Sequence, residues 1–170
     1  RKRMQKRPVL SGIGLVLAVA IIGWISTAPY LSNEGLGRLP GLIIGGTATA
    51  APADFSQFNG VVPGPLMMKQ TGFPPFVNYL SWVGAEGGEV TARRPDNGRW
   101  ARRVRESNGD GWLRIGDATY EMTAEEIEGP ERIAMMQLWA AKAGRTLDEP
   151  LYQGSEPLRE WKVFFWRPRS

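Results

Sequence analysis

The chain has 170 residues with no histidine and no cysteine, and its formal net charge is +4 at pH 7. Without imidazole and thiol groups it cannot form a Ser-His-Asp triad, a thiolate nucleophile, a disulfide or a conventional zinc site. Five of its 21 Lys and Arg residues lie in the first seven positions, so the remaining 16 basic residues stand against 17 acidic ones. The excess positive charge therefore belongs to the N-terminal tail, and we expect no nucleic-acid partner.

The chain begins with a basic tail, residues 1–7, followed by an apolar stretch, residues 8–31, that has no charged side chain. Crossing about 30 Å of hydrocarbon takes about 20 helical residues, whereas the apolar part of a signal peptide has only about 7–15. A small-residue cleavage pattern occurs at 26–28, but Pro29 follows it and is a poor residue to cut before. We therefore expect an uncleaved transmembrane helix over residues 8–31.

The charges that flank this helix predict its orientation. Basic residues are retained on the cytoplasmic side of a membrane, so we expect the tail in the cytoplasm and everything after about Ser32 in the periplasm of a bacterium. The protein is then a single-pass inner-membrane protein in contact with the lipid bilayer. Gly12, Gly14 and Gly23 thin one side of the helix, which favours the close approach of another helix, although a glycine-rich span is also common without a partner.

Residues 32–65 are predicted to be a linker, because glycine and proline recur too often for a regular element. Four apolar residues within it, Leu39, Leu42, Ile43 and Ile44, should be covered by something. One interpretation is that they pack on the protein's own domain, and the other is that they contact lipid headgroups or a neighbouring subunit. The sequence leaves both open.

Residues 66–170 are enough for one small domain with a single core. A late helix is predicted to begin near Pro130 and to end at Gly144, while residues 100–105 are compatible with a short helix or a strand. Strands are expected at 76–83, 89–93, 112–115, 118–122 and 161–166. The fold class is therefore α+β, a small and mostly antiparallel barrel with one good helix.

Three stretches carry a resemblance to a known family: LMMKQTGFPPFVNYL at 66–80, RWARRV at 99–104 and WLRIGDATYEMTAEEIEGPERIA at 112–134. They are similar to the first strand pair, the short tryptophan-bearing helix, and the hairpin with its acidic connection and helix in the deazaflavin-dependent nitroreductase/quinone reductase family. The resemblance covers about 100 of the 170 residues. It implies a split β-barrel that, in the family, holds a deazaflavin.

The chain departs from the family where the family holds the cofactor's phosphates. Members usually carry a basic loop there, roughly R/K-x-S-G-x-x-R, whereas here Thr71-Gly72 runs directly into Phe73-Pro74-Pro75. Proline has no N–H to offer an anion, and the family's histidine before the tryptophan helix is also missing. Only Trp100, with Arg94 or Arg103, matches positions that line the cofactor pocket in the family.

Two classes of function compete. The first is a non-catalytic accessory subunit of a larger respiratory or photosynthetic membrane complex, without catalytic residues, metal or cofactor, which meets other subunits through Gly12, Gly14 and Gly23 and through the apolar linker residues. The alternative is a membrane-bound flavin- or deazaflavin-dependent oxidoreductase acting on quinones, for which the resemblance implies Arg94, Trp100 and Arg103 as cofactor-binding residues. A lipid or small-ligand binder is a third and weaker interpretation.

Overall fold

The computed structural model describes residues 7–33, 41–96 and 98–170, and in the N-terminal helix it describes the side chains of residues 11–25. The chain divides into two compact units, Arg1–Ile43 and Ile44–Ser170. We describe each unit by itself.

The first unit contains one helix, α1 (Arg7–Asn33). Pro8 lies in its first turn, where the missing N–H costs nothing. The apolar side chains described between Ile13 and Trp24 are exposed in this unit. The predicted helix is thus present, but among the described residues no helix was found with the length and hydropathy that a membrane crossing needs.

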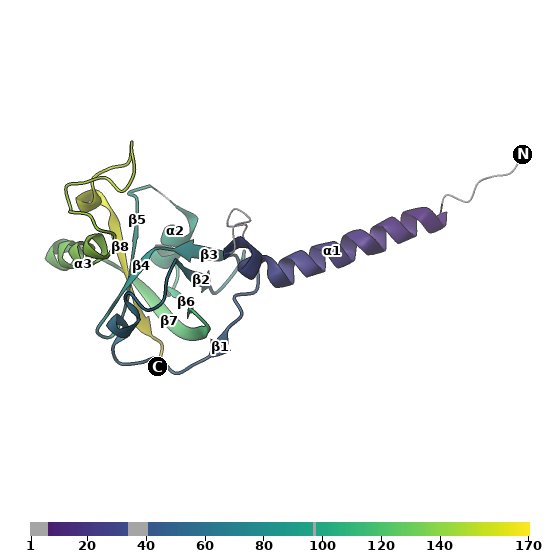
Figure 1. Ribbon diagram of the computed structural model, residues 1–170, viewed down its shortest axis with the longest axis horizontal. Helices are drawn as coiled ribbons and strands as arrows, with labels where there is room; N and C mark the ends of the chain where they lie inside the picture. Colours follow the sequence, from purple (N-terminus) through teal and green to yellow (C-terminus); the bar gives the residue numbers. More distant parts are fainter. Residues whose placement is uncertain (1–6, 34–40, 97) are drawn as a thin grey trace, which may run out of the picture. The chain divides into compact units, whose positions relative to one another are not determined.

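The second unit is a β domain with an eight-stranded sheet (Figure 1). Its strands are β1 (Thr47–Ala48), β2 (Leu66–Gln70), β3 (Val77–Leu80), β4 (Trp82–Ala85), β5 (Gly88–Arg93), β6 (Asp110–Ile115), β7 (Ala118–Ile127) and β8 (Lys162–Pro168). The hydrogen-bonded order is β3-β2-β6-β7-β8-β5-β4, and β1 pairs with β7 as the parallel exception in an otherwise antiparallel sheet. Two helices, α2 (Arg99–Glu106) and α3 (Gly129–Lys142), and two short 3₁₀ helices, η1 (Phe55–Phe58) and η2 (Leu158–Glu160), complete the domain.

The sheet curls because β3 and β4, which are consecutive along the chain, lie at its two ends. β3 pairs with β2, β4 pairs with β5, and only Ser81 separates β3 from β4 along the chain. The two ends of the strand order must therefore meet at Ser81, which curves the sheet into a half-barrel. This confirms an α+β fold with a mostly antiparallel, barrel-like sheet.

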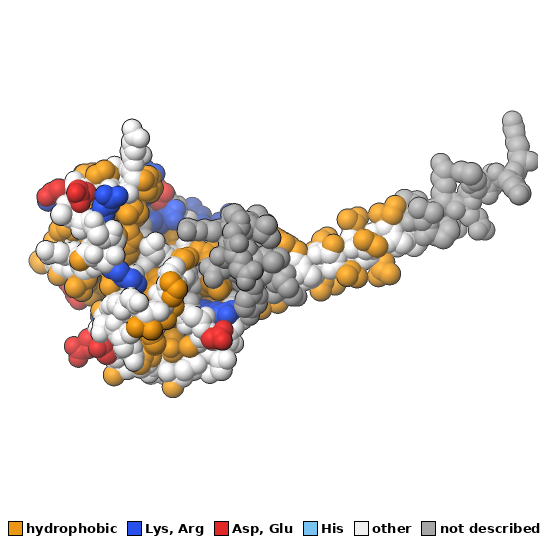
Figure 2. Space-filling model, in the orientation of Figure 1, with side chains coloured by type: hydrophobic (Ala, Val, Ile, Leu, Met, Phe, Trp, Pro, Cys, Tyr) orange, Lys and Arg blue, Asp and Glu red, His pale blue; other side chains and the backbone are white. Residues whose placement is uncertain are grey.

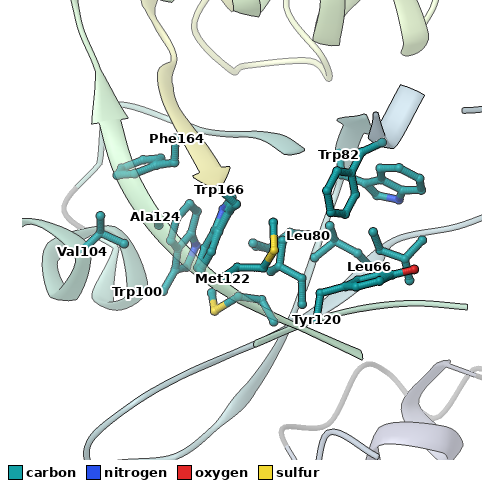
Figure 3. Close-up of a cluster of buried hydrophobic side chains, with 14 of the residues drawn as sticks. Leu66, Leu80, Trp82, Trp100, Val104, Tyr120, Met122, Ala124, Phe164 and Trp166 are labelled. Atoms are coloured by element: carbon teal, nitrogen blue, oxygen red, sulfur yellow. The ribbon is translucent and has the colours of Figure 1, made fainter. Parts of the chain in front are cut away.

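Each face of the sheet carries its own apolar core, as the alternation along β8 illustrates. Phe164 and Trp166 belong to one cluster, while Val163 and Phe165 belong to the other. We call the first the α2-side core, since Trp100, Ala101 and Val104 of α2 join it, and Figure 3 shows part of it. The second, the α3-side core, is covered by Met136, Trp139 and Ala140 of α3.

The structure adds β2 to the predicted strands and extends the strand expected at 118–122 to Ile127. Three further differences concern the arrangement of the domain. The strand expected at 76–83 is two strands with a bend at Ser81, and residues 99–106 form a helix, which settles the open alternative. The domain begins at Ile44 rather than Leu66, because β1 pairs with β7 and Phe55 is fully buried in the α2-side core. The second half of the expected linker is therefore part of the folded domain.

Candidate functional site: a cleft between the two cores

A cleft of about 330 Å³ opens where β3, β5 and α2 approach the chain that follows α3. We call it the arginine cleft, because Arg93 at the end of β5 and Arg94 directly after it line it. Its volume falls within the range of small-molecule sites, and five aromatic side chains contribute to a lining that is polar over much of its area. These are Tyr79, Trp100, Trp139, Tyr152 and Trp161.

Two indole groups fix the walls of the cleft by hydrogen bonds to the backbone. Trp139 Nε1 donates to the carbonyl of Ser81 at 3.2 Å, and Trp161 Nε1 donates to the carbonyl of Glu156 at 3.2 Å. The two rings lie 5.8 Å apart between centroids. The bend that joins the ends of the sheet is thus held directly by α3, and the cleft forms beside that joint.

Arg94 lines the cleft, but its guanidinium is paired with a carboxylate of the same domain. Its Nε and Nη2 donate to the two carboxylate oxygens of Glu156 at 2.9 and 3.2 Å, and the group lies 5.8 Å from the centre of the Tyr152 ring. The hydrogen bonds to Glu156 raise the pKa of Arg94 and lower the pKa of Glu156. Both groups therefore stay charged at neutral pH.

Trp100 is a core residue whose edge reaches the cleft. It is 5 % exposed, and its ring meets Phe164 edge-on with centroids 4.7 Å apart (Figure 3). The carbonyl of Trp100 accepts a hydrogen bond from Nε2 of the buried Gln70 at 3.0 Å. The side chain expected to line a cofactor pocket thus packs mainly inside the protein.

Arg103 points instead toward the turn between β2 and β3. Its Nη1 donates to the carbonyl of Pro74 at 2.8 Å, and its Nη2 donates to the carbonyl of Thr71. With Trp100 it lines a small cavity of about 30 Å³ next to this turn. The structure therefore brings Trp100 close to each of the two arginines, but Arg94 and Arg103 line different hollows.

The turn between β2 and β3 does not fit the phosphate tail of a deazaflavin. The N–H of Thr71 donates to the carbonyl of Asp110 at 3.0 Å, and Pro74 and Pro75 have no N–H. The nearest cation, Arg103, is bonded to two carbonyls of the turn itself. An anion placed here would meet backbone carbonyls more readily than donors.

A buried acid, Glu89 on β5, was not anticipated from the sequence. Its side chain is fully buried, and neither carboxylate oxygen has a hydrogen-bond partner. Burial raises its pKa to about 9, against an opposing effect of Lys142, so the group is protonated at neutral pH. In a sheet with one solvent-exposed face, the alternation of side chains along β5 would place Glu89 in solvent. Here the sheet curls, so both faces of β5 are buried.

The expected interface residues are partly described. A Cβ built at Gly12, Gly14 or Gly23 would meet no atom within 4 Å. At about 100° per residue, however, Gly12 and Gly23 align within about 20°, whereas Gly14 lies near the opposite side. The expectation that all three glycines thin one side of α1 was therefore wrong for Gly14.

The apolar linker residues within the described range differ in their exposure to solvent. Leu39 lies outside the described residues, Leu42 is half-buried, and Ile43 is 43 % exposed. Ile44 is half-buried and its carbonyl accepts a hydrogen bond from Nη1 of Arg114 at 3.0 Å. Ile44 thus belongs to the β domain, and Ile43 remains as an exposed candidate for contact with a partner.

No protein-family model matches the chain, and comparison with curated proteins gives no match either. Among the described residues there is also no cluster of three or more carboxylates or other ligands suited to a metal ion. The cleft can therefore be judged only by its own chemistry. It has five aromatic side chains, Arg93 paired with Asp96, Arg94 paired with Glu156, and neither imidazole nor thiol.

Proposed function

We propose that the protein is a non-catalytic accessory subunit of a larger energy-transducing complex in a bacterial inner membrane, with its N-terminus in the cytoplasm and its β domain in the periplasm. One observation carries the non-catalytic part. The polar groups that the family resemblance implies for cofactor binding are bonded to the protein itself, Arg94 to Glu156 and Arg103 to two carbonyls of the β2–β3 turn. These arginines stabilise the fold in place of a ligand.

The membrane anchor is supported by the sequence. Residues 8–31 carry no charged side chain, five basic residues precede them, and a helix covers Arg7–Asn33. The described apolar side chains of α1 have no cover within the unit. A lipid environment is the solvent in which such a helix is stable.

Assembly with a partner helix is supported by the aligned pair Gly12 and Gly23. A Cβ built at either residue would meet no atom within 4 Å, and small residues let two helix backbones approach closely in a bilayer. Respiratory and photosynthetic assemblies are the expected hosts because they contain many single-span accessory subunits.

The test is to solubilise membranes gently, recover the full chain by a C-terminal tag and identify co-purifying proteins by mass spectrometry. Gly12→Leu with Gly23→Leu should remove the partners by steric blocking, whereas Gly14→Leu, on the other side of α1, should leave them bound. Recovery of the native chain without any stoichiometric membrane subunit would reject the proposal. Equal recovery of the same subunits with both variants would show that the contact does not involve the side of α1 that carries Gly12 and Gly23.

A second contact surface is tested by Ile43→Ser, with Ile44→Ser as its comparison. Ile43 is exposed, so its change should weaken co-purification without altering the melting of the chain. Ile44 is partly buried in the domain, so its change should lower the melting temperature. Lower melting with Ile43→Ser would show that this residue is core as well.

The alternative function, a flavin- or deazaflavin-dependent quinone oxidoreductase, is favoured by the aromatic walls and volume of the arginine cleft. It is distinguished by thermal shift of the full chain with each cofactor. A ligand at 100 times its dissociation constant adds about 2.7 kcal/mol to the free energy of unfolding, which gives a measurable shift. We expect no shift, and a clear one would favour the oxidoreductase.

A further inference from the structure

The turn between β2 and β3 and the exposed side of α2 form a surface distinct from the arginine cleft. Phe73 at the tip of the turn is 91 % exposed, which is unusual for a large aromatic side chain. Around it lies a shallow depression of about 550 Å³. We call the residues that line it the headgroup surface; they include Phe73, Pro74, Phe76, Arg99 and Arg102.

Phe73 is held outward by the protein and is not simply at the end of a loose loop. Arg103 bonds the carbonyls of Thr71 and Pro74, one on each side of Phe73. Gly72 supplies the left-handed backbone at φ 90° that the turn requires. The ring is therefore presented to its surroundings without further ordering of the turn, which lowers the entropic cost of docking.

The surroundings of the ring are cationic. Arg99 is exposed and has no partner among the described residues, and Arg102 is 52 % exposed with Glu106 at 3.9 Å. Figure 2 shows blue Lys and Arg side chains gathered where Figure 1 places α2. The apolar part of the lining is small and consists of Phe73, Pro74 and Phe76. It is bordered by more cations than acids, since Glu106 is the one acid among the described residues that line the depression. This differs from the depletion of charge at the centre of a protein interface.

We propose that the headgroup surface docks on anionic lipid headgroups, with the ring of Phe73 in the interface and Arg99 and Arg102 against lipid phosphates. Aromatic rings favour the level of the headgroups, and basic side chains near an anionic leaflet each add to the attraction. The inference rests on the proposed membrane anchor, because α1 keeps the domain within reach of one leaflet. It adds a second, lipid-charge-dependent attachment to that function.

The absence of native cysteine allows a single labelled cysteine to test the proposal in the full chain. Phe73→Cys, carrying an apolar environment-sensitive fluorophore, is reconstituted in nanodiscs of phosphatidylglycerol or of phosphatidylcholine that contain spin-labelled lipid as quencher. Val61→Cys, at a 73 % exposed position of another loop, is the matched control. We expect quenching at position 73 in the anionic discs, weak quenching there in the neutral discs, and none at position 61.

The charge requirement is tested with the probe kept at position 73. Arg99→Gln and Arg102→Gln should each lower the ratio of quenched to unquenched probe about fivefold, and high salt should lower it as well. Arg145→Gln, an exposed arginine beyond α3, should have no effect. The role of the ring itself is tested with a probe at Pro75→Cys, where Phe73→Ser should reduce quenching.

An unquenched probe at position 73, equal quenching at positions 73 and 61, or equal quenching in neutral and anionic discs would each overturn the proposal. Failure of the anchor is seen separately, as failure of the chain to co-elute with the discs. In that case anionic vesicles are added to the labelled chain, because surface docking needs no span. Quenching at 73 would then support the docking surface alone, and its absence would reject it.

Discussion

The two cores of the β domain are built from the same strands but differ in what they enclose. The α3-side core consists of aliphatic and aromatic side chains from β4, β5, β7, β8, α3 and η2, together with Trp161 between η2 and β8. The α2-side face also buries Glu89 and Thr91, and it recruits Phe55 from far upstream. The α3-side core forms where a helix packs on the sheet. The α2-side core lies inside the curled sheet, whose curvature also buries polar side chains.

The two cores should therefore respond differently to mutation. In the α3-side core a truncation alters packing, and only at Trp139 and Trp161 does it also remove a side-chain hydrogen bond to the backbone. In the α2-side core it alters packing together with the protonation of Glu89 or the hydrogen bond that Trp166 Nε1 donates to Thr91 Oγ1 at 3.0 Å. The predictions below separate these contributions, in order of expected size.

The largest effect is expected from Trp166→Ala, compared with its neighbour Phe165→Ala. Trp166 is fully buried in the α2-side core, so its removal should lower the free energy of unfolding by about 3–5 kcal/mol. Phe165 belongs to the α3-side core, and its truncation should cost less, near the lower end of that range. Urea denaturation of the full chain in detergent measures both, and a greater loss with Phe165→Ala would reverse the comparison.

The second prediction concerns pH. The pKa of Glu89 is about 9 in the folded chain and about 4.5 when the carboxyl is free, so the folded state binds a proton that the unfolded state releases between these values. The free energy of unfolding should be highest below about pH 4.5 and fall as the pH rises toward 9, with a loss of about 3 kcal/mol already at pH 7. Glu89→Gln should remove this slope and be more stable than the native chain at pH 7.

The control is Glu86→Gln in the same hairpin, since Glu86 is exposed. It should keep the native pH dependence. A native slope in Glu89→Gln would show that Glu89 is not the group responsible, and Lys142→Gln would then test the cation that opposes its shift.

A smaller effect is expected from Thr91→Val. The change leaves the buried Trp166 Nε1 without an acceptor, which should cost about 1–3 kcal/mol although the side-chain volume is conserved. Thr49→Val, at an exposed position, is the comparison and should have little effect. If both variants unfold at the same urea concentration as the native chain, the hydrogen bond of Trp166 contributes nothing to stability.

The smallest effect is expected at the arginine cleft. Arg94→Gln breaks the pair with Glu156, but both side chains are more than a third exposed, so the loss should be below about 1 kcal/mol. Melting of the chain checks this. A larger loss would mean that the pair holds the segment after α3 in place.

The helix that covers the α3-side core could be predicted from the sequence, whereas most of the contacts in the α2-side core could not. Ile133, Met136 and Ala140 recur at helical spacing, Pro130 lies at a helix start, and α3 follows both signals. Local pattern was sufficient there because a helix and a neighbouring strand bury each other.

The α2-side core depends on contacts between residues far apart in the sequence. Phe55 sits in a segment rich in glycine and proline, and its place in the core depends on Gly84, where a Cβ would lie 2.1 Å from the Phe55 carbonyl oxygen. The bend at Ser81 could not be predicted from the sequence either, because residues with high strand propensity lie on both sides of it. For the candidate site, the family resemblance implied Arg94, Trp100 and Arg103, but only the fold reveals that Arg94 bonds to Glu156 and that Arg103 bonds to two backbone carbonyls.

The position of β8 has a consequence for biogenesis. The last strand of the chain lies in the middle of the strand order, between β7 and β5. Until the segment Lys162–Pro168 has been synthesised, the edges of β5 and β7 that pair with it have no partner, and unpaired edges invite aggregation. The sheet therefore cannot be completed before this segment is available, and a chain without residues 162–168 lacks the strand that joins β7 to β5.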